Sequence, residues 1–334
     1  MRVKTGRLLQ KIMLVYLGID VGAVTTKLAL LDTSANLVAS LYLPTGGEPV
    51  AAVQEGLRQI ARQLPPDVDI KGVAVTGSAR YLAGAVVGAD LVKNEITCQS
   101  VAAVHFIPDV QTVIEIGGQD SKLIIVRDGM VADFGLNTVC AAGTGSFLDH
   151  QAARLKMTIE EFSRRALLGS DSVRISGRCT VFAESDMVHK QQTGRRIDDI
   201  IYGLCRALVR NYLGDVASGK EIRPPVVFQG GVAFNGGIVR AFREELKTDI
   251  IVPPRHEVMG AIGAALLVRE QSPSGLGLFK GFTVSDAEFR TSSFACQSCP
   301  TTCEIVRVTE DGKVIAGWGG RCDIWESKIS GQGV

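Results

Sequence analysis

The chain has 334 residues, which is too long for one ordinary hydrophobic core and suits two lobes with a small appendage. Its 37 glycines and its low aromatic content of 6% favour an α/β protein with many tight turns over a β-sandwich. A formal net charge of +1 argues against a nucleic-acid partner held by a basic surface.

The N-terminal segment 1–14 is basic and leads into a short apolar run, IMLVYLGID. Asp20 interrupts this run too soon for a membrane span, and no small-residue cleavage site precedes a mature domain. We therefore expect a cytoplasmic protein with no membrane partner.

The first lobe begins with a predicted meander of three strands, over residues 15–20, 27–31 and 35–43. The turn between the first two strands should point backbone N–H groups outward, and its polar and small residues are Asp20, Gly22, Thr25 and Thr26. Hydrophobic spacing then predicts a helix over 48–63, a buried strand over 72–76 and a helix over 97–106.

An internal repeat follows. Residues 19–32 (IDVGAVTTKLALLD) align without a gap on residues 114–127 (IEIGGQDSKLIIVR), at a constant offset of 95. Asp20 falls on Glu115, Gly22 on Gly117 and Lys27 on Lys122. A repeat of this size predicts two similar lobes that face each other. Two such turns, rich in backbone donors and small hydroxyls, are typical of sites for anions, phosphates above all.

The second lobe continues with strands over 123–126 and 131–134 and is mostly helical after Cys140, over 146–155, 159–168, 180–192 and 197–217. A strand over 224–229 leads into a third glycine turn, GGVAFN, and a helix over 238–246. A strand over 250–252 and a closing helix over 257–270 complete the two lobes. Any one of these glycine turns alone could be an ordinary hairpin.

Together the three turns resemble the phosphate-1, phosphate-2 and adenosine motifs of the actin, Hsp70 and sugar-kinase ATPase superfamily. The resemblance covers roughly residues 15–270 and implies ATP in a cleft between two ribonuclease-H-like lobes. It implies that Asp20 holds hydrated Mg²⁺ and that Gln119 and Asp120 orient an attacking water. The implied nucleotide contacts are Gly22, Thr25, Thr26, Lys27, Gly117, Gly118, Gly230, Gly231 and Asn235. Lys122 suits a structural role and a phosphate-binding role equally.

Eight cysteines in a cytosolic chain should be free, catalytic or metal-bound rather than paired in disulfides. Cys140 and Cys179 each precede a predicted helix, whose N-terminus favours the thiolate form that binds metal. From composition alone, two buried apolar cysteines are an alternative interpretation.

The segments around them, NTVCAAGTGSFLD and ISGRCTVFAESDMV, resemble the cysteine motifs of the ATPase activators of 2-hydroxyacyl-CoA dehydratases and benzoyl-CoA reductases; IEIGGQDSK and QGGVAFN are similar to that family too. The resemblance implies a homodimer that holds one oxygen-sensitive [4Fe-4S] cluster, with Cys140 and Cys179 supplied by each subunit. A cubane needs four thiolates, which a symmetric dimer provides. The rival, an intrachain cluster, would add Cys98 and Cys205, which fit packing positions better.

The family resemblance also implies partners. The electron donor would be a ferredoxin or flavodoxin, and the client would be an iron–sulfur dehydratase, reductase or double-cubane-cluster protein. The sequence does not name the client.

A linker over 271–281 leads to a Cys-rich appendage over 282–334. Strands over 304–308 and 313–318 flank a Glu-Asp-Gly turn and predict a hairpin. The hairpin should bring Cys322 back beside Cys296, Cys299 and Cys303, in metal-ligand spacing. Zinc (Zn²⁺), a second iron–sulfur cluster and reduced thiols without metal all remain open.

We therefore predict an α/β fold of two duplicated ribonuclease-H-like lobes, the actin/Hsp70 type, with a small Cys-rich β-hairpin appendage. The first lobe spans 15–108 with the closing helix 257–270, and the second spans 109–256. The predicted function is an ATP-driven reductase that hydrolyses ATP to ADP and passes one electron to its client. The alternatives are a small-molecule kinase of the same fold and a nucleotide-gated scaffold with inert cysteines.

Overall fold

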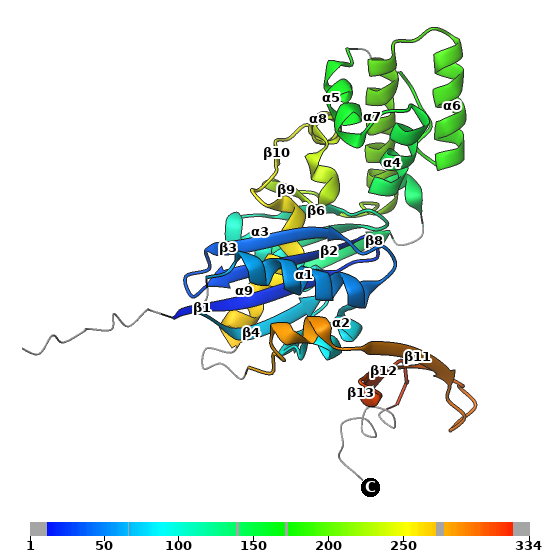
Figure 1. The fold of residues 1–334 in the computed structure, drawn as a ribbon. Coiled ribbons are helices and arrows are strands. Elements are labelled where there is room, and N and C mark those ends of the chain that lie inside the picture. The colour runs from blue at the N-terminus through cyan, green and yellow to red at the C-terminus, as the bar shows by residue number, and fades with distance from the viewer. Residues whose placement is uncertain (1–11, 66, 138–139, 171–172, 272–276, 323–334) are drawn as a thin grey trace, which may run out of the picture. The chain divides into compact units, whose positions relative to one another are not determined.

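The computed structural model describes residues 12–65, 67–137, 140–170, 173–271 and 277–322 (Figure 1). Nearly all of the predicted basic segment 1–14 lies outside these ranges. The chain divides into two units, Met1–Asn94 with Gly260–Val334 and Glu95–Met259. Within the described ranges, every helix is too short or too polar to cross a membrane.

The first unit contains a five-stranded sheet with the order β3-β2-β1-β4-β5. The first three strands form the predicted antiparallel meander, and β4 and β5 run parallel to β1. The strands are β1 (Met13–Val21), β2 (Thr25–Asp32), β3 (Leu37–Pro44), β4 (Val68–Thr76) and β5 (Leu91–Val92). Helices α1 (Pro49–Gln63), α2 (Arg80–Val87) and α9 (Met259–Gln271) accompany them, of which α2 was not predicted.

Strand β1 is the centre of this unit because both of its faces are buried. Leu17 and Ile19 belong to the hydrophobic core that also contains Leu57 of α1. On the other face, Gly18 touches α9 so closely that a Cβ atom there would lie 1.8 Å from the carbonyl oxygen of Ala261. The sequence of β1 is therefore a nearly continuous apolar run, with Gly18 at the point where the backbone of α9 crosses the strand.

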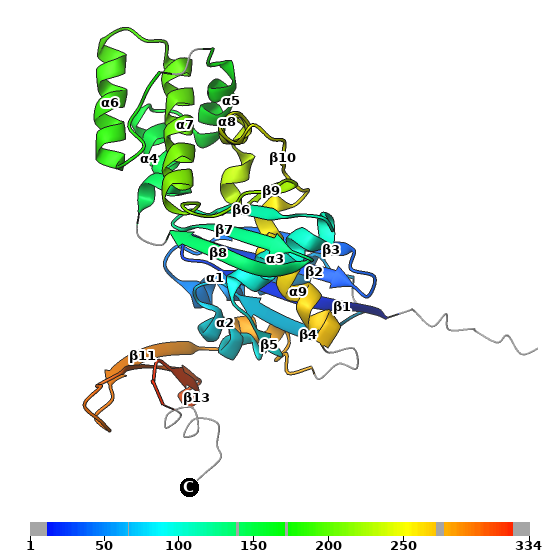
Figure 2. The same cartoon turned by 180° about the vertical axis from the view of Figure 1, so that it is seen from behind.

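The second unit repeats this sheet, with the order β10-β9-β6-β7-β8. Helix α3 lies beside β6, β7 and β8 (Figure 2). The strands are β6 (Thr112–Ile116), β7 (Ser121–Arg127), β8 (Met130–Asn137), β9 (Val226–Gln229) and β10 (Ile250–Ile251). The helices are α3 (Glu95–Phe106), α4 (Gly145–Arg154), α5 (Ile159–Leu168), α6 (Thr180–Gln192), α7 (Ile197–Asp215) and α8 (Gly236–Leu246).

The predicted repeat is confirmed at the level of strand register. Asp20 lies opposite Lys27 in the first hairpin, and Glu115 lies opposite Lys122 in the second. Both turns close with the same hydrogen bond, since Gly22 N–H donates to Thr25 and Gly117 N–H donates to Asp120, each at 3.0 Å.

The boundary between the units differs from the expected position at residue 108. Helix α3 belongs to the second unit because it packs on β6, β7 and β8. Hydrophobic spacing within the helix shows that it has a buried face but does not reveal which of the two neighbouring sheets it packs on.

The appendage is a three-stranded sheet rather than the predicted hairpin alone. The hairpin of β12 (Glu304–Glu310) and β13 (Lys313–Trp318) is present, and β11 (Phe289–Ala295) pairs with β12. Strand β11 escaped prediction because nearly all of its residues are exposed and its sequence lacks apolar alternation. Gln54 and Arg58 of α1 donate hydrogen bonds to backbone carbonyls of Val284, Ala287 and Ser285, so the start of the appendage docks on the first unit.

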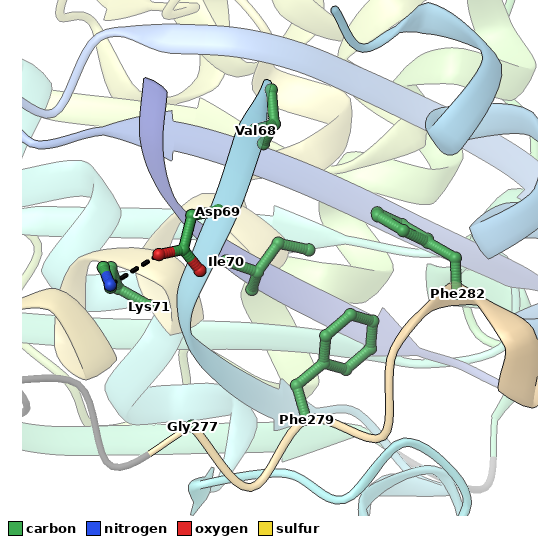
Figure 3. Close-up of a pocket in the computed structure, with 7 residues that line it drawn as sticks. All are labelled: Val68, Asp69, Ile70, Lys71, Gly277, Phe279 and Phe282. Carbon is green, nitrogen blue, oxygen red and sulfur yellow. Dashed lines mark ion pairs between the residues drawn. The ribbon is translucent and has the colours of Figure 1, made fainter. Parts of the chain in front are cut away.

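A shallow cavity of about 390 Å³ lies where the chain enters the appendage (Figure 3). Phe279 and Phe282 meet edge to face, and Ile70 of β4 lines the same space. Asp69 and Lys71 pair with each other on the opposite side of β4 (Figure 3). With its charges already paired, this cavity serves packing of the connecting segment.

The contact between Gly18 and α9 gives a prediction. Gly18→Ala should lower the free energy of unfolding by about 3 kcal/mol or more, because the new methyl group overlaps a backbone oxygen. Gly214→Ala in α7 is the control, since a Cβ there meets nothing within 4 Å and helix propensity should add up to about 1 kcal/mol. Urea unfolding followed by circular dichroism measures both, and an unchanged midpoint for Gly18→Ala would contradict the packing argument.

Candidate functional site

The first turn lies at the end of β1 and is formed as predicted. Asp20 is buried, and its Oδ2 lies 3.3 Å from Lys27 Nζ. Thr25 is half-buried, whereas the Thr26 side chain is fully buried and its hydroxyl bonds to Thr45 at 2.9 Å. The hydroxyl that this turn offers to a ligand is therefore that of Thr25, and Thr26 contributes to the packing of the turn.

The second turn carries a buried charge network that the repeat alone did not predict. Lys122 Nζ lies 2.8 Å from Glu95 Oε2, 3.0 Å from Glu115 Oε2 and 2.8 Å from Asp120 Oδ2. Of the two roles considered for Lys122, its three carboxylate partners favour the structural one. Gln119 at the tip is exposed.

Burial decides the protonation of this network. Desolvation raises the pKa of Glu115 to about 7, although the positive charge of Lys122 opposes the shift. Desolvation lowers the pKa of Lys122, but its three carboxylate partners together outweigh that effect and raise the pKa well above its usual value, so the lysine stays charged. One cation thus serves three acids, and burial makes Glu115 take up a proton at a higher pH than an ordinary glutamate does.

The third turn meets the second within the same unit. Gly230 has a φ of +92°, and a Cβ atom there would lie 2.5 Å from the carbonyl oxygen of Ile116. Asn235 caps α8, because its Oδ1 accepts from the N–H groups of Gly237 and Ile238. Gly231 is half-buried beside them.

An exposed ring accompanies the third turn and was missed by sequence reasoning. Phe234 is 64% exposed and meets the His256 ring edge to face, with 4.3 Å between centroids. An exposed phenylalanine inside a glycine-rich strand-to-helix turn was the available signal. Such a ring offers a flat apolar surface to a planar ligand.

The second turn is bonded directly to the segment after Cys140. The N–H of Gly145 donates to the carbonyl of Gly117 at 2.9 Å, and the N–H of Ser146 donates to that of Gly118 at 2.8 Å. The Ser146 hydroxyl donates to the same Gly118 oxygen at 2.5 Å. The first turn of α4 is therefore held by the glycine turn.

Asn137 adds a second connection from the end of β8. Its Nδ2 donates to the carbonyl of Cys140 at 2.8 Å, and its Oδ1 accepts from the Cys140 N–H at 2.9 Å. Asn137 also lies opposite Ser121, the residue that follows Asp120, in the pairing of β7 with β8. Cys140 is thus clamped to the sheet edge that carries the second turn.

The two cysteines of the predicted cluster occupy related positions. Cys179 is the N-cap of α6, as expected, whereas Cys140 precedes a short 3₁₀ turn and lies five residues before α4. Both are half-buried free thiols. A cavity of about 760 Å³ is lined by Cys140 and by Gly177 and Arg178, which immediately precede Cys179. The fold therefore brings the two cysteine segments to one cavity.

The remaining cysteines fall into two groups. Cys98 and Cys205 are fully buried, and burial raises the pKa of the Cys205 thiol far above its usual range, as befits packing residues. In the appendage, Cys296 is buried, Cys303 is half-buried and Cys299 and Cys322 are exposed. No group of three or more His, Cys, Asp or Glu side chains within the described ranges has metal-holding geometry.

The raised pKa of Glu115 gives a prediction about stability. The pKa of Glu115 is higher in the folded state than in the unfolded state. The contribution of protonated Glu115 to the free energy of unfolding is therefore complete below pH 4.5 and is lost as the pH rises to about 7. The stability of Glu115→Gln relative to wild type should therefore rise by on the order of 3 kcal/mol across that interval. Urea unfolding at a series of pH values measures it.

Glu221→Gln is the control, because Glu221 is an exposed acid whose pairing with Arg223 lowers its pKa. Its stability difference should change little with pH, and in the opposite direction. A pH-independent difference for Glu115→Gln would show that burial does not raise the pKa of Glu115.

Comparison with known proteins agrees with this geometry. A model of the BadF/BadG/BcrA/BcrD ATPase family matches residues 17–268. The 2-hydroxyisocaproyl-CoA dehydratase activator of Clostridioides difficile is 34% identical over 262 residues, which cover 77% of this chain and 95% of that protein. The (R)-2-hydroxyglutaryl-CoA dehydratase activating ATPase of Acidaminococcus fermentans is 35% identical over 253 residues, or 75% of this chain and 95% of that protein.

Solved structures give the same result. The Clostridium difficile activator of 2-hydroxyisocaproyl-CoA dehydratase with bound ADPNP has a TM-score of 0.72 at 33% identity, over 78% of this chain and 96% of that one. The matched residues include all three glycine turns, Cys140 and Cys179, and the family match ends before the appendage. This chain belongs to the BadF/BadG/BcrA/BcrD ATPase family.

Proposed function

We propose that this protein is an ATP-driven reductase that activates an iron–sulfur enzyme of the 2-hydroxyacyl-CoA dehydratase, benzoyl-CoA reductase or double-cubane-cluster type. The observation that carries the proposal is the set of hydrogen bonds that joins the second glycine turn to the segment of Cys140. A kinase has no need of cysteines at the starts of two helical segments. The names of the relatives also favour an activator over the kinase alternative.

The nucleotide part of the proposal rests on the two matched turns. Thr25, Lys27 and the backbone of Gly22 would contact phosphate oxygens, as would the backbone of Gly117 and Gly118. Asp20 is suited to water-mediated Mg²⁺ binding, since Mg²⁺ prefers oxygen ligands and keeps several waters. Its carboxylate is already oriented by Lys27. The exposed Gln119, next to Asp120, would position the attacking water.

The third turn would hold the adenosine. Gly230 and Gly231 have no side chains, so a ligand could approach their backbone closely. The cap that Asn235 forms on α8 fixes the shape of the turn. The exposed Phe234 would lie against the base.

The cysteine part rests on the cavity that Cys140 shares with the segment before Cys179. A [4Fe-4S] cluster bound there would supply a one-electron carrier. Two thiols per chain require a second copy, so we propose a homodimer with one cluster on its symmetry axis. Both thiols are partly exposed, which fits an oxygen-sensitive site that takes an electron from a ferredoxin or flavodoxin.

The hydrogen bonds of the second turn provide the coupling. If nucleotide binding moves the carbonyls of Gly117 and Gly118, the first turn of α4 moves with them because Gly145 and Ser146 are bonded to those atoms. A movement of the end of β8 would also move the backbone of Cys140, because the Asn137 side chain is hydrogen-bonded to both its N–H and its carbonyl. Nucleotide state would then change the surroundings of the cysteine sulfur, which set the potential of a bound cluster.

We also propose that the appendage binds metal through its four cysteines, which would have to move together around the ion because the described residues do not form a metal site as they stand. The N–H of Ser298 donates to the sulfur of Cys296, and hydrogen bonds from Thr301 lower the pKa of the Cys299 thiol. Sulfurs that accept hydrogen bonds in a tight turn suit thiolate ligands. Cys303 would complete the set with Cys322, which follows the turn at Gly319 that packs on Glu304.

Metal analysis of anaerobically purified protein tests both sites. We expect about four irons per dimer if the shared cluster is the only one, and about twelve if each appendage carries another. Zinc with about four irons would assign zinc to the appendage. Colourless, iron-free protein with a sugar-dependent ATPase activity would instead support the kinase.

Cys140→Ser should remove the shared cluster and leave ADP binding unchanged, because serine keeps the backbone hydrogen bonds between this position and Asn137. Iron content and an ADP titration measure the two properties. A variant that keeps all of its iron would refute the shared-cluster model.

The reciprocal variant is Asp20→Ala, which should keep the visible spectrum of the cluster while ATP hydrolysis falls by about 100-fold or more. Unchanged hydrolysis would mean that the Mg²⁺ site lies elsewhere.

The coupling is tested with Ser146→Ala, which removes the hydroxyl that bonds Gly118. Loss of one hydrogen bond of about 1 kcal/mol should shift the balance between the ADP and ATP states about fivefold. The difference in visible circular dichroism of the cluster between ADP and ATP measures this shift. Ser185→Ala in α6, whose hydroxyl bonds its own helix at Val181, is the matched control and should change nothing. Equal behaviour of the two variants would exclude coupling through Ser146.

A further inference from the structure

The cavity beside Cys140 contains positive charge without matching negative charge. Three arginines line it, Arg174, Arg178 and Arg210, together with one acid, Asp215. Within the described ranges none of these arginines forms a salt bridge, although most arginines elsewhere in this unit do. Such an excess is unusual in a cavity that also holds a free thiol.

Arg210 is the most informative of the three. It projects from α7, is about half-buried, and its Nη2 donates to the carbonyl of Ile175 at 2.7 Å. Desolvation lowers the pKa of Arg210, and the neighbouring charges of Arg206 and Arg174 act in the same direction, against Glu245. Glu245 itself pairs with Arg206, at 2.9 Å. Among the residues that the structure describes, Arg210 is therefore a partly desolvated cation without a direct counterion, which is costly in an empty cavity.

An anion in the cavity would offset the free-energy cost of desolvating Arg210. A cluster held by four thiolates carries net negative charge, and it becomes more negative on reduction. Cations that face it stabilise the reduced form more than the oxidised form, because the interaction energy scales with the charge.

We propose that Arg174, Arg178 and Arg210 compensate the charge of the thiolate-bound cluster at Cys140 and thereby raise its reduction potential. The inference rests on the proposed function. It assigns these arginines as tuning residues, which act on the cluster electrostatically and bind no substrate. Arg210 contributes most because its surroundings screen its charge least, whereas Arg174 and Arg178 are exposed.

The test is a redox titration of the iron-loaded dimer with ADP, followed by electron paramagnetic resonance. Arg210→Gln should lower the equilibrium constant for cluster reduction at least tenfold, which is 59 mV for one electron. Arg174→Gln and Arg178→Gln should give smaller shifts that shrink as salt is added. Arg210→Lys keeps the charge and should restore most of the wild-type potential.

Arg243→Gln is the matched control. Arg243 is an exposed arginine of α8 that does not line the cavity, so its removal changes the net charge equally and should leave the potential unmoved. A potential that is unchanged in Arg210→Gln, or that moves equally in Arg243→Gln, would overturn the inference.

Three further outcomes are informative. If Arg210→Gln does not fold, the exposed pair Arg174→Gln and Arg178→Gln carries the test, and a double variant without a salt-dependent shift would overturn the proposal. Wild-type protein without iron would refute the proposed function and this inference with it. Iron-loaded protein whose potential ignores all three arginines would refute this inference alone.

Discussion

The arrangement of the functional site in the second unit depends on the hydrogen bonds from the first turn of α4 to Gly117 and Gly118. They join a glycine turn, which has the properties of a phosphate site, to the segment of a half-buried cysteine. Two of them are backbone bonds, so they depend on the path of the chain more than on any side chain. Because helix N–H groups and turn carbonyls satisfy each other here, the turn cannot change its shape without moving the helix.

The two hairpins show how one backbone frame supports different electrostatics. In the first, Lys27 faces Asp20 across the strand pair. In the second, Lys122 faces the corresponding Glu115 and gains Asp120 and Glu95 as well. Helix α3 supplies Glu95, which adds an ion pair to its packing on the second sheet. The buried network fixes the second turn, and the desolvation of Glu115 is the cost of that rigidity.

The chain extends beyond the family match into the appendage, which packs on the first unit through Gln54 and Arg58. The Tyr81 and Trp318 rings, 6.4 Å apart, add a contact between α2 and β13. The second unit differs at Cys140, where three arginines line a cavity and form no salt bridge with any described residue. The polar groups between the appendage and α1 are hydrogen-bonded, whereas the cavity at Cys140 has an excess of positive charge.

The internal repeat predicted the duplicated fold, and the resemblance of short motifs to known families predicted the roles of the three glycine turns and of the two cysteine segments. Strand register followed from the offset of 95 residues, since Asp20 and Glu115 both lie opposite a lysine. The sequence could not place α3 with the second sheet, detect the exposed strand β11 or assign Lys122 three carboxylate partners. Nor could it join Ser146 to Gly118, or gather Arg174 and Arg210 around Cys140. These contacts connect segments up to about seventy residues apart, and only tertiary packing decides which buried or half-buried charges meet.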